Sequence, residues 1–351
     1  MKIRWRSRPI GKRIRSHRMR TVKRILDDFA QIRQIGTLKT MHFSGSELTD
    51  SSYTVLKPSM YCGASSHHIH CENFEFKSGE KLLFFGRDEV DNTTTWLDLN
   101  NCTGIITSET FNLFPALDYV NFKGCTLEFS AKSFAAIKNI RAIDIRESKV
   151  SISKEIFEDC ETLESMHLKD LKLPDQDCFS PLKKLNMLTI EECQFENSNS
   201  NIFRELFSLQ YLIIERCELP IFGDVYQDFK NLEMLILMHN KIGELNCDGI
   251  FNLQKLKDIA IFNNETISVI DYERFQTMPL LETILFENNV YKTLDLRAFP
   301  SLKLVKIGTL TDIPTPTDEE LFKKFDDMNI TYQFTFCGKI EVDMSKVLIC
   351  A

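Results

Sequence analysis

Three histidines and a cysteine near the start of the repetitive part of the chain have the side chains of a metal site. They lie in the segment His67-His68-Ile69-His70-Cys71, and imidazole and thiolate groups are ligands that zinc prefers. A zinc site would need a second group of ligands at a familiar spacing, and the neighbouring sequence offers none. We therefore expect no metal here, and we expect Cys71 to form a disulfide with Cys62.

The motifs of common enzyme classes are missing from the sequence. It contains no GxSxG or HExxH motif, no phosphate-binding loop and no CxxC pair. Charged residues occur mainly at the outward positions of the predicted strands, where solvation is their usual role. We therefore expect neither catalysis nor a cofactor.

A repeat organises the chain and would position any functional residue. In Leu117–Leu127, apolar residues occupy positions 1, 4, 6 and 11 and a cysteine occupies position 9. The same frame returns about every 23 residues, which predicts ten strands whose residues at positions 4 and 6 run from Leu97 and Leu99 to Val305 and Ile307. Because side chains alternate along a strand, positions 4 and 6 should point inward and positions 3, 5 and 7 outward.

Two further features complete each repeat. A second apolar pair precedes position 1, as in Phe111 and Phe114, and its spacing of three residues predicts a short helical or 3₁₀ turn behind the strand. Position 9 carries a residue that can donate to the carbonyls of the turn, and we expect these side chains to be structural. They are Cys102, Cys125, Cys193, Cys217, Asn240, Asn264 and Asn289.

The pattern LxxLxLxx(N/C)xL, with Phe in the return segment, resembles the typical class of leucine-rich repeat over about residues 72–310. The resemblance implies an α/β solenoid: a curved horseshoe with a parallel concave β-sheet and short helical or irregular convex segments, capped at both ends. The chain is similar to arthropod Toll and chaoptin ectodomains and to leucine-rich immune proteins. This similarity implies a non-enzymatic, receptor-like recognition protein in innate immunity or cell recognition. The expected caps depart from those families because each holds two cysteines, and no leader, transmembrane segment or signalling domain is visible.

We divide the chain into four parts. Residues 1–57 form a basic arm and linker, and residues 58–92 form an N-terminal cap whose first irregular strand has Phe74 and Phe76 at positions 4 and 6. Residues 93–310 hold about ten repeats, and residues 311–351 form a C-terminal cap closed by Cys337 and Cys350. Cys178 and Cys247 lie three repeats apart, too far to pair.

The basic arm carries most of the charge asymmetry. Residues 1–40 hold 13 Lys and Arg against Asp27 and Asp28, whereas the remainder holds 30 against 48 acidic residues. Ile25 to Ile35 could form one short helix. The arm could be a solvated tail, a product of a wrongly assigned start, or a contact to nucleic acid or membrane. The last possibility defines the alternative function, an intracellular scaffold or inhibitor.

The expected concave face changes character along the solenoid. Position 7 of the early repeats stacks Lys123, Arg146 and Lys169 into a basic column flanked by Asp144. The later repeats carry apolar residues that should form an exposed patch of several hundred Å²: Met187, Tyr211, Ile213, Met234, Ile236, Met238, Phe262 and Leu285. We expect a protein, lipid or glycan partner on this patch; self-association and coverage by the chain's own tail are the alternatives.

Four N-x-S/T sequons bear on the location of the protein. Asn92, Asn101 and Asn329 fall near the caps or a strand edge and are expected to carry glycans, whereas Asn264 occupies an inward position 9 and is expected to stay unmodified. Together with the cap cysteines, the sequons favour a secreted or cell-surface protein.

Overall fold

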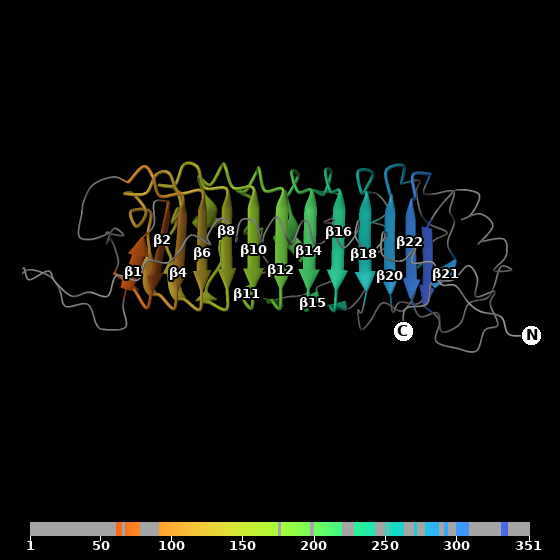
Figure 1. Ribbon diagram of the computed structural model, residues 1–351, viewed down its shortest axis with the longest axis horizontal. Helices are drawn as coiled ribbons and strands as arrows, with labels where there is room; N and C mark the ends of the chain where they lie inside the picture. Colours follow the sequence, from red (N-terminus) through yellow and green to blue (C-terminus); the bar gives the residue numbers. More distant parts are fainter. Residues whose placement is uncertain are drawn as a thin grey trace, which may run out of the picture.

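The computed structural model shows a solenoid built around one long sheet. It describes residues 61–64, 67–77, 91–174, 177–196, 200–219, 228–242, 250, 253–262, 270–271, 278–287, 291–293, 300–308 and 331–335. The main sheet has 13 strands in the order β1-β2-β4-β6-β8-β10-β12-β14-β16-β18-β20-β22-β23, and the strands lie side by side along the long axis (Figure 1). Among these residues, no helix is long and apolar enough to cross a membrane.

The main sheet confirms the predicted ten strands and their register. All neighbouring strands pair in parallel except β1 (Tyr61–Ala64), which is antiparallel to β2 (His68–Glu72). The ten predicted strands are β4 (Trp96–Asn100), β6 (Tyr119–Lys123), β8 (Ala142–Arg146), β10 (Ser165–Lys169), β12 (Met187–Glu191), β14 (Tyr211–Glu215), β16 (Met234–Met238), β18 (Asp258–Phe262), β20 (Thr283–Glu287) and β22 (Leu304–Gly308). Equivalent positions of adjacent strands stand opposite each other, so every position forms a continuous row.

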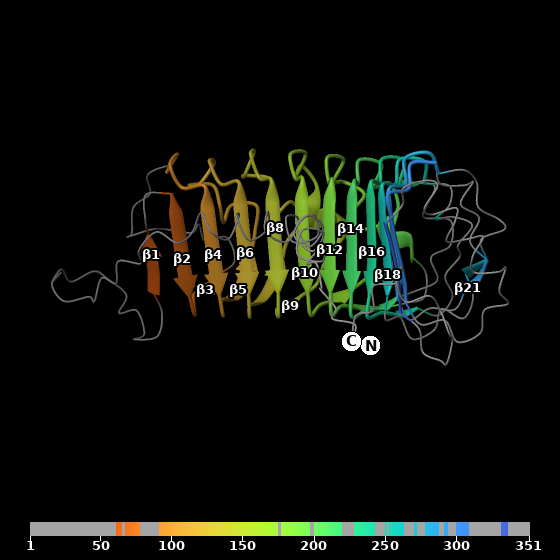
Figure 2. The ribbon, with the colours of Figure 1, turned by 45° about the vertical axis from the view of Figure 1, so that its right-hand side comes forward.

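Short strands follow the strands of the main sheet from β2 to β20 (Figure 2). They comprise β3 (Glu75–Phe76), β5 (Thr103–Ile106), β7 (Thr126–Phe129) and β9 (Lys149–Val150), then β11 (Lys172–Leu173), β13 (Gln194–Phe195), β15 (Glu218–Leu219) and β17 (Lys241–Ile242), and finally β19 (Ile270–Asp271) and β21 (Tyr291–Thr293). Two 3₁₀ turns, η1 (Lys154–Phe157) and η2 (Ser200–Phe203), lie in the return segments. The predicted helical returns are therefore single turns at most in this part of the chain.

The core lies between the main sheet and the return segments. Residues at positions 4 and 6 are buried, from Leu97 and Leu99 through Leu235 and Leu237. Behind them the return-segment phenylalanines form a spine; the ring centroids of Phe111 and Phe134 are 6.0 Å apart, and the next pair is separated by 6.3 Å. Each repeat thus buries its apolar side only against its neighbours, as a solenoid requires.

Position 9 forms the predicted internal ladder. The Cys125 thiol donates to the carbonyl of Leu99 at 3.2 Å, and the Asn240 amide donates to that of Ile214 at 2.9 Å. In return, the Asn240 side-chain oxygen accepts from the backbone N–H of Cys217 at 2.9 Å. These bonds satisfy turn groups that water cannot reach. The cysteines at this position are therefore structural.

The predicted first strand is wrong by five residues. In β2, Ile69 pairs with Leu97 and Cys71 pairs with Leu99, so these two residues, and not Phe74 and Phe76, occupy positions 4 and 6. The prediction subtracted a constant period, but the first repeat is longer: Ile69 and Leu97 are 28 residues apart. Phe76 instead belongs to β3, where its backbone pairs with Gly104.

Gly104 permits that pairing. Its φ is +107°, and a Cβ on this residue would lie 1.9 Å from the Phe76 carbonyl oxygen. No other residue type could approach so closely in that conformation. The close packing of β3 on β5 therefore depends on the glycine.

The main sheet continues beyond the predicted end of the repeats. β23 (Thr331–Thr335) pairs in parallel with β22, so the sheet takes one strand more than the array that was expected to end at residue 310. The structure does not describe the basic arm, the Cys337–Cys350 pair, Cys247, Asn264 or Asn329.

Candidate functional site

The concave face of the main sheet presents three rows of side chains, from positions 3, 5 and 7. At its early end the Trp96 and Tyr119 rings are neighbours in the first row, with centroids 4.0 Å apart, and His68 meets Trp96 edge-on at 5.9 Å. Trp96 is only half-buried. This aromatic group escaped sequence reasoning, although the register of positions 3 would have revealed it.

Asp98 and Asp144 anchor the polar part of this face. Asp98 accepts from His68 at 2.8 Å and from Asn121 at 2.9 Å. Burial by itself raises the pKa of Asp98, but these hydrogen bonds outweigh it and the pKa is lowered. Asp144, which is 3% exposed, pairs with Arg146 at 2.7 Å and accepts from the Tyr119 hydroxyl at 3.3 Å.

His167 joins two repeats by standing between two carboxylates. Its Nδ1 lies 3.3 Å from Asp144 and its Nε2 lies 3.4 Å from Glu191. Burial lowers the pKa of His167, but the hydrogen bonds and charges of the two carboxylates outweigh burial and the pKa is raised. The same contact, helped by Lys169, lowers the pKa of Glu191 to about 2.

The expected basic column is largely neutralised. Arg146 pairs with Asp144, and Lys169 pairs with Glu191 at 3.1 Å and with Glu192 at 3.4 Å. Lys123 is exposed, and the structure gives no ion pair for it. The prediction placed Asp144 beside the column but missed that Glu191 and Glu192, at positions 7 and 8 of β12, reach the same row.

Buried polar atoms without a hydrogen-bond partner gather on this face. They include Asn100 Oδ1, Arg146 Nε, Ser165 Oγ and Thr189 Oγ1. All four belong to positions 3, 5 or 7 of β4 to β12. Among the described residues, the core layer contains no buried side-chain N or O atom without a hydrogen-bond partner. Since an unpaired buried polar group costs about 1–3 kcal/mol, the outward rows of β4 to β12 carry a cost that the core layer does not.

The expected exposed apolar patch is buried instead. Ile213, Met234 and Ile236 are 2–4% exposed and form, with Ala260, a cluster separate from the main core. Tyr211 and Met238 pack against this concave cluster and are half-buried, as is Met187. The side chains of Phe262 and Leu285 lie outside the described residues. The prediction of outward orientation was correct, but the prediction that Ile213, Met234 and Ile236 meet solvent was wrong.

The cysteines and histidines of the N-terminal strands fall where a disulfide is possible. β1 and β2 place Cys62 directly opposite Cys71, and Cys71 is disulfide-bonded. His68 is engaged with Asp98, and the described residues contain no group of three His, Cys, Asp or Glu side chains that could hold a metal ion.

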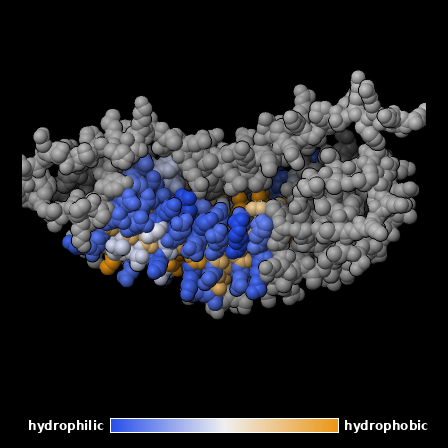
Figure 3. All heavy atoms as spheres, turned by 60° about the horizontal axis from the view of Figure 1, so that its bottom comes forward, coloured by the Kyte–Doolittle hydropathy of each residue, from blue (hydrophilic) through white to orange (hydrophobic). Residues whose placement is uncertain are grey.

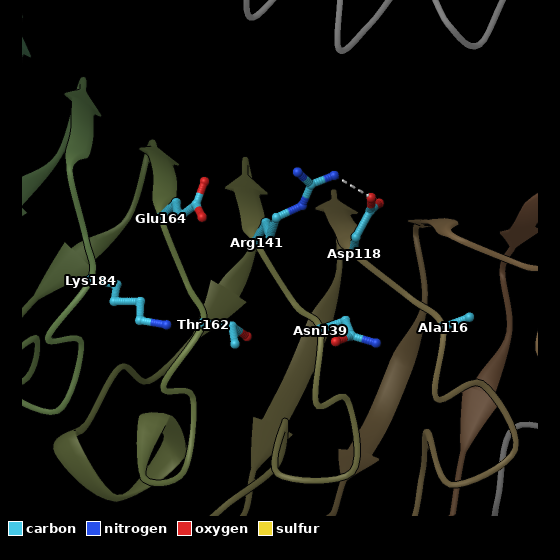
Figure 4. Close-up of a pocket in the computed structure, with 7 residues that line it drawn as sticks. All are labelled: Ala116, Asp118, Asn139, Arg141, Thr162, Glu164 and Lys184. Carbon is cyan, nitrogen blue, oxygen red and sulfur yellow. Dashed lines mark hydrogen bonds and ion pairs between the residues drawn. The ribbon is translucent and has the colours of Figure 1, made fainter.

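A shallow polar depression lies on the strand-entry flank (Figure 4). Its lining comprises Ala116, Asp118, Asn139, Arg141, Thr162, Glu164 and Lys184. Arg141 points to Asp118 and pairs with it at 2.8 Å, and the Thr162 hydroxyl donates to the Ile140 carbonyl. Within the lining, Arg141 and Asp118 neutralise each other, and no hydrogen bond links the Thr162 hydroxyl to a base.

The strand-exit flank is largely hydrophilic (Figure 3). Position 8 residues there adopt positive φ, including Asn101 (53°), Glu147 (52°) and Glu192 (54°), and each backbone N–H bonds a carbonyl of the next strand. That bond offsets the cost of a left-handed conformation for a residue other than glycine. Asn92 and Asn101 are both exposed, so a glycan on either would meet no core residue.

Known proteins share both the repeat and its arrangement. The model of the family "BspA type Leucine rich repeat region (6 copies)" matches residues 104–233. Toll-like receptor 3 of Bos taurus is 24% identical over 226 residues, which is 62% of this chain but 24% of the receptor. The human leucine-rich repeat-containing protein 36 is 34% identical over 92 residues, 26% of this chain and 12% of that protein.

Two solved structures show the same fold. The Toll–Spatzle complex from Drosophila aligns with a TM-score of 0.53 and 15% identity, covering 80% of this chain and 44% of that one. The mouse RP105/MD-1 complex aligns with a TM-score of 0.55 and 14% identity, covering 78% and 51%. The chain thus spans about a quarter of the length of the receptor it matches. It is a leucine-rich repeat protein whose solenoid is similar to Toll ectodomains.

Proposed function

We propose that this protein is a non-enzymatic recognition module that binds a protein partner on its concave face, outside the cell. One relative is a Toll-like receptor, and two solved neighbours are complexes of Toll with Spatzle and of RP105 with MD-1. Because the chain covers only part of those proteins, their partners are not carried over to it.

The distribution of unsatisfied polar groups carries the proposal. On the flanks and the convex side, charged residues pair with one another, as do Lys132 with Asp159 at 2.9 Å and Lys183 with Glu205 at 2.7 Å. On the concave face, Asn100, Ser165 and Thr189 hold buried atoms without partners beside the half-buried Trp96. A protein surface supplies donors, acceptors and apolar area together, which suits this combination.

Binding to a panel of purified secreted and cell-surface proteins from the same organism tests the proposal. The concave variant Trp96→Ala/Lys123→Glu should weaken binding to a panel member by roughly thirtyfold or more, because truncation of a central aromatic residue typically costs at least about 2 kcal/mol. The matched convex variant Lys132→Glu/Lys183→Glu should bind like the wild type. If a panel member fails to bind only the convex variant, the binding site lies on the convex side.

An extracellular location is supported by the cap geometry. Directly opposed residues of an antiparallel pair have Cα atoms about 4.5–5.5 Å apart, within the range a disulfide needs, so we expect Cys71 to pair with Cys62. The exposed Asn92 and Asn101 are expected to carry glycans. An electrophoretic mobility that changes on glycosidase treatment would agree with this location. So would a mobility shift on a non-reducing gel that Cys62→Ser abolishes. Free thiols at Cys62 and Cys71 in native material would favour the intracellular alternative.

A further inference from the structure

The internal ladder formed by position 9 is interrupted at one repeat. In the repeats of β4 to β16, position 9 holds a cysteine, a serine or an asparagine, except in the repeat of β10, where it holds Leu171. Leu171 is 4% exposed, so it is buried like the residues of the ladder. Its side chain, however, can neither donate nor accept a hydrogen bond.

The side chains of the ladder tie consecutive repeats together. The backbone N–H of Cys125 donates to the Ser148 hydroxyl at 3.0 Å, and that of Cys217 donates to the Asn240 side-chain oxygen at 2.9 Å. The Ser148 N–H would need the Leu171 side chain as the equivalent acceptor. The joint between the repeats of β8 and β10 therefore lacks this bond.

The short strands that follow the main strands form a second layer, and this layer breaks at the same joint. β3, β5, β7 and β9 form one sheet and β11, β13, β15 and β17 form another; the structure describes both β9 and β11, and they do not pair. On either side the layer is continuous: the N–H of Lys149 donates to the Cys125 carbonyl at 2.7 Å, and that of Gln194 donates to the Leu171 carbonyl at 2.9 Å. A further break separates β17 from β19, where the structure does not describe position 9.

The phenylalanine spine also changes at this joint. The rings of Phe111 and Phe134 are 8° from parallel, and so are those of Phe134 and Phe157. The rings of Phe157 and Phe179, which follow β9 and β11, are tilted by 43° at a centroid distance of 6.3 Å. The spine thus stays in contact across the joint but loses its regular stacking.

The main sheet, in contrast, crosses the joint without a break. β8 and β10 pair in register over their whole length, and on the concave side His167 of β10 lies 3.3 Å from Asp144 of β8. On the convex side Lys154 pairs with Asp177 at 3.0 Å, but the two side chains are 46% and 38% exposed. Exposed pairs contribute about 1 kcal/mol or less. The joint is therefore held firmly on its concave side and weakly on its convex side.

The spacing of the two layers sets the bend between consecutive repeats. Where both layers pair, the strands lie about 4.8 Å apart in each layer, and the angle between the repeats is fixed. Where only the main sheet pairs, the second layer can widen or narrow, and the angle can change. The joint lies close to the point where the concave face passes from the polar strand β8 to the apolar strand β16.

We propose that the interruption at Leu171 gives the solenoid a hinge between the repeats of β8 and β10. The main sheet is the axis of the hinge, and the gap between β9 and β11 is the side that opens. Bending at this joint turns the polar early half of the concave face relative to the apolar late half. If the proposed function also holds, a partner that contacts both halves binds one bend angle in preference to others.

Distances between rigid spin labels in the full-length protein, measured by electron paramagnetic resonance, test the hinge without any partner. One pair of labels, at Thr126 and Gln194, straddles the gap between β9 and β11. The control pair, at Lys172 and Lys241, lies within the sheet of β11 to β17. Each pair is three strands apart in the same row of the second layer, and all four residues are exposed. The labels are attached through p-azidophenylalanine because the chain has 11 cysteines of its own.

A bend of about 10° moves a layer that lies about 10 Å from the axis by roughly 2 Å, so the distances between Thr126 and Gln194 should spread over roughly 2 Å more than the control distances. Leu171→Asn supplies the amide that Asn240 supplies in its own repeat. It should remove most of the extra spread and leave the control pair unchanged.

Equal spreads for the two pairs in the protein with Leu171 intact would overturn the proposal, whether or not the variant folds. An extra spread that persists in Leu171→Asn, with an unchanged circular dichroism spectrum, would also overturn it, because the interruption at Leu171 would not be its cause. Both outcomes are independent of the binding assay of the concave variant, so failure of the hinge is distinguishable from failure of the proposed function.

Discussion

β8 and β16 occupy equivalent places in the same sheet yet differ on their outward faces. In β8, positions 5 and 7 carry Asp144 and Arg146, which pair with each other and with neighbouring repeats. In β16, positions 3 and 5 carry Met234 and Ile236, which form a second buried cluster. The inward faces are alike: the residues at positions 4 and 6 are buried in both strands. The inward residues thus form the same core along the solenoid. The outward rows differ, and they set the chemistry of each half of the concave face.

Removal of Asp144 should produce the largest effect and should be confined to the early half. Asp144→Ala leaves Arg146 and His167 without their shared carboxylate in a buried position, which typically costs about 3–5 kcal/mol. Urea unfolding at pH 7 measures this cost. Asp118→Ala, which breaks the exposed pair with Arg141, should cost less than about 1 kcal/mol. Equal effects of the two variants would mean that burial does not distinguish these pairs.

Truncation of Ile236 should reveal the burial of the late half. Ile236→Ala removes a buried side chain and should lower the free energy of unfolding by about 2–4 kcal/mol. Phe207→Ala, at a residue that is 40% exposed, should cost far less. An Ile236→Ala protein as stable as the wild type would show that the concave cluster is open in solution.

The early half should also respond to pH. Because the folded-state pKa of His167 is raised, its protonated form stabilises the fold; this contribution is complete below the unfolded value of about 6.5 and is lost as pH rises through the folded pKa. Stability should therefore fall as the pH rises above about 6.5 and through the raised pKa of His167, by at most about 1.4 kcal/mol per pH unit for one proton. His167→Gln should flatten this profile, whereas Ile236→Ala should leave its slope unchanged. A slope that survives in His167→Gln would assign it to another group.

The smallest loss of stability is expected for a substitution at the boundary of the two halves. Lys169 links β10 to Glu191 of β12 and is a quarter exposed, so Lys169→Ala should cost about 0.5–1 kcal/mol in urea unfolding at low salt. The same substitution at Lys241, whose pair with Glu218 is mostly exposed, should be close to neutral. A larger loss at Lys241 than at Lys169 would contradict the ranking.

Periodicity predicted the inward residues well because each repeat must present the same apolar positions to its neighbours. Leu97, Phe111 and Cys125 lie as expected for this reason. A fixed period failed at Ile69 and Cys71, since the first repeat is longer and nothing in Phe74 or Phe76 distinguishes a second-layer strand from a main strand. A longer first repeat leaves no trace in the spacing of later ones.

The candidate site was less predictable because the burial and charge pairing of outward residues depend on residues of other strands. Sequence reasoning placed Ile213 and Ile236 on the correct face but not in a buried cluster. It also took Lys169 as a free positive charge, since the carboxylates of Glu191 and Glu192 come from the next strand. The strand Met-Leu-Ile-Leu-Met carried the missing signal, because near-continuous apolar strands are typical of sheets that are buried on both faces.

A side-by-side comparison of partner binding by Trp96→Ala/Lys123→Glu and by Lys132→Glu/Lys183→Glu tests most directly whether the concave face is the recognition surface. We predict that the first variant loses roughly thirtyfold or more in affinity and that the second binds like the wild type. Equal losses in both variants, or a loss in the second alone, would contradict the account.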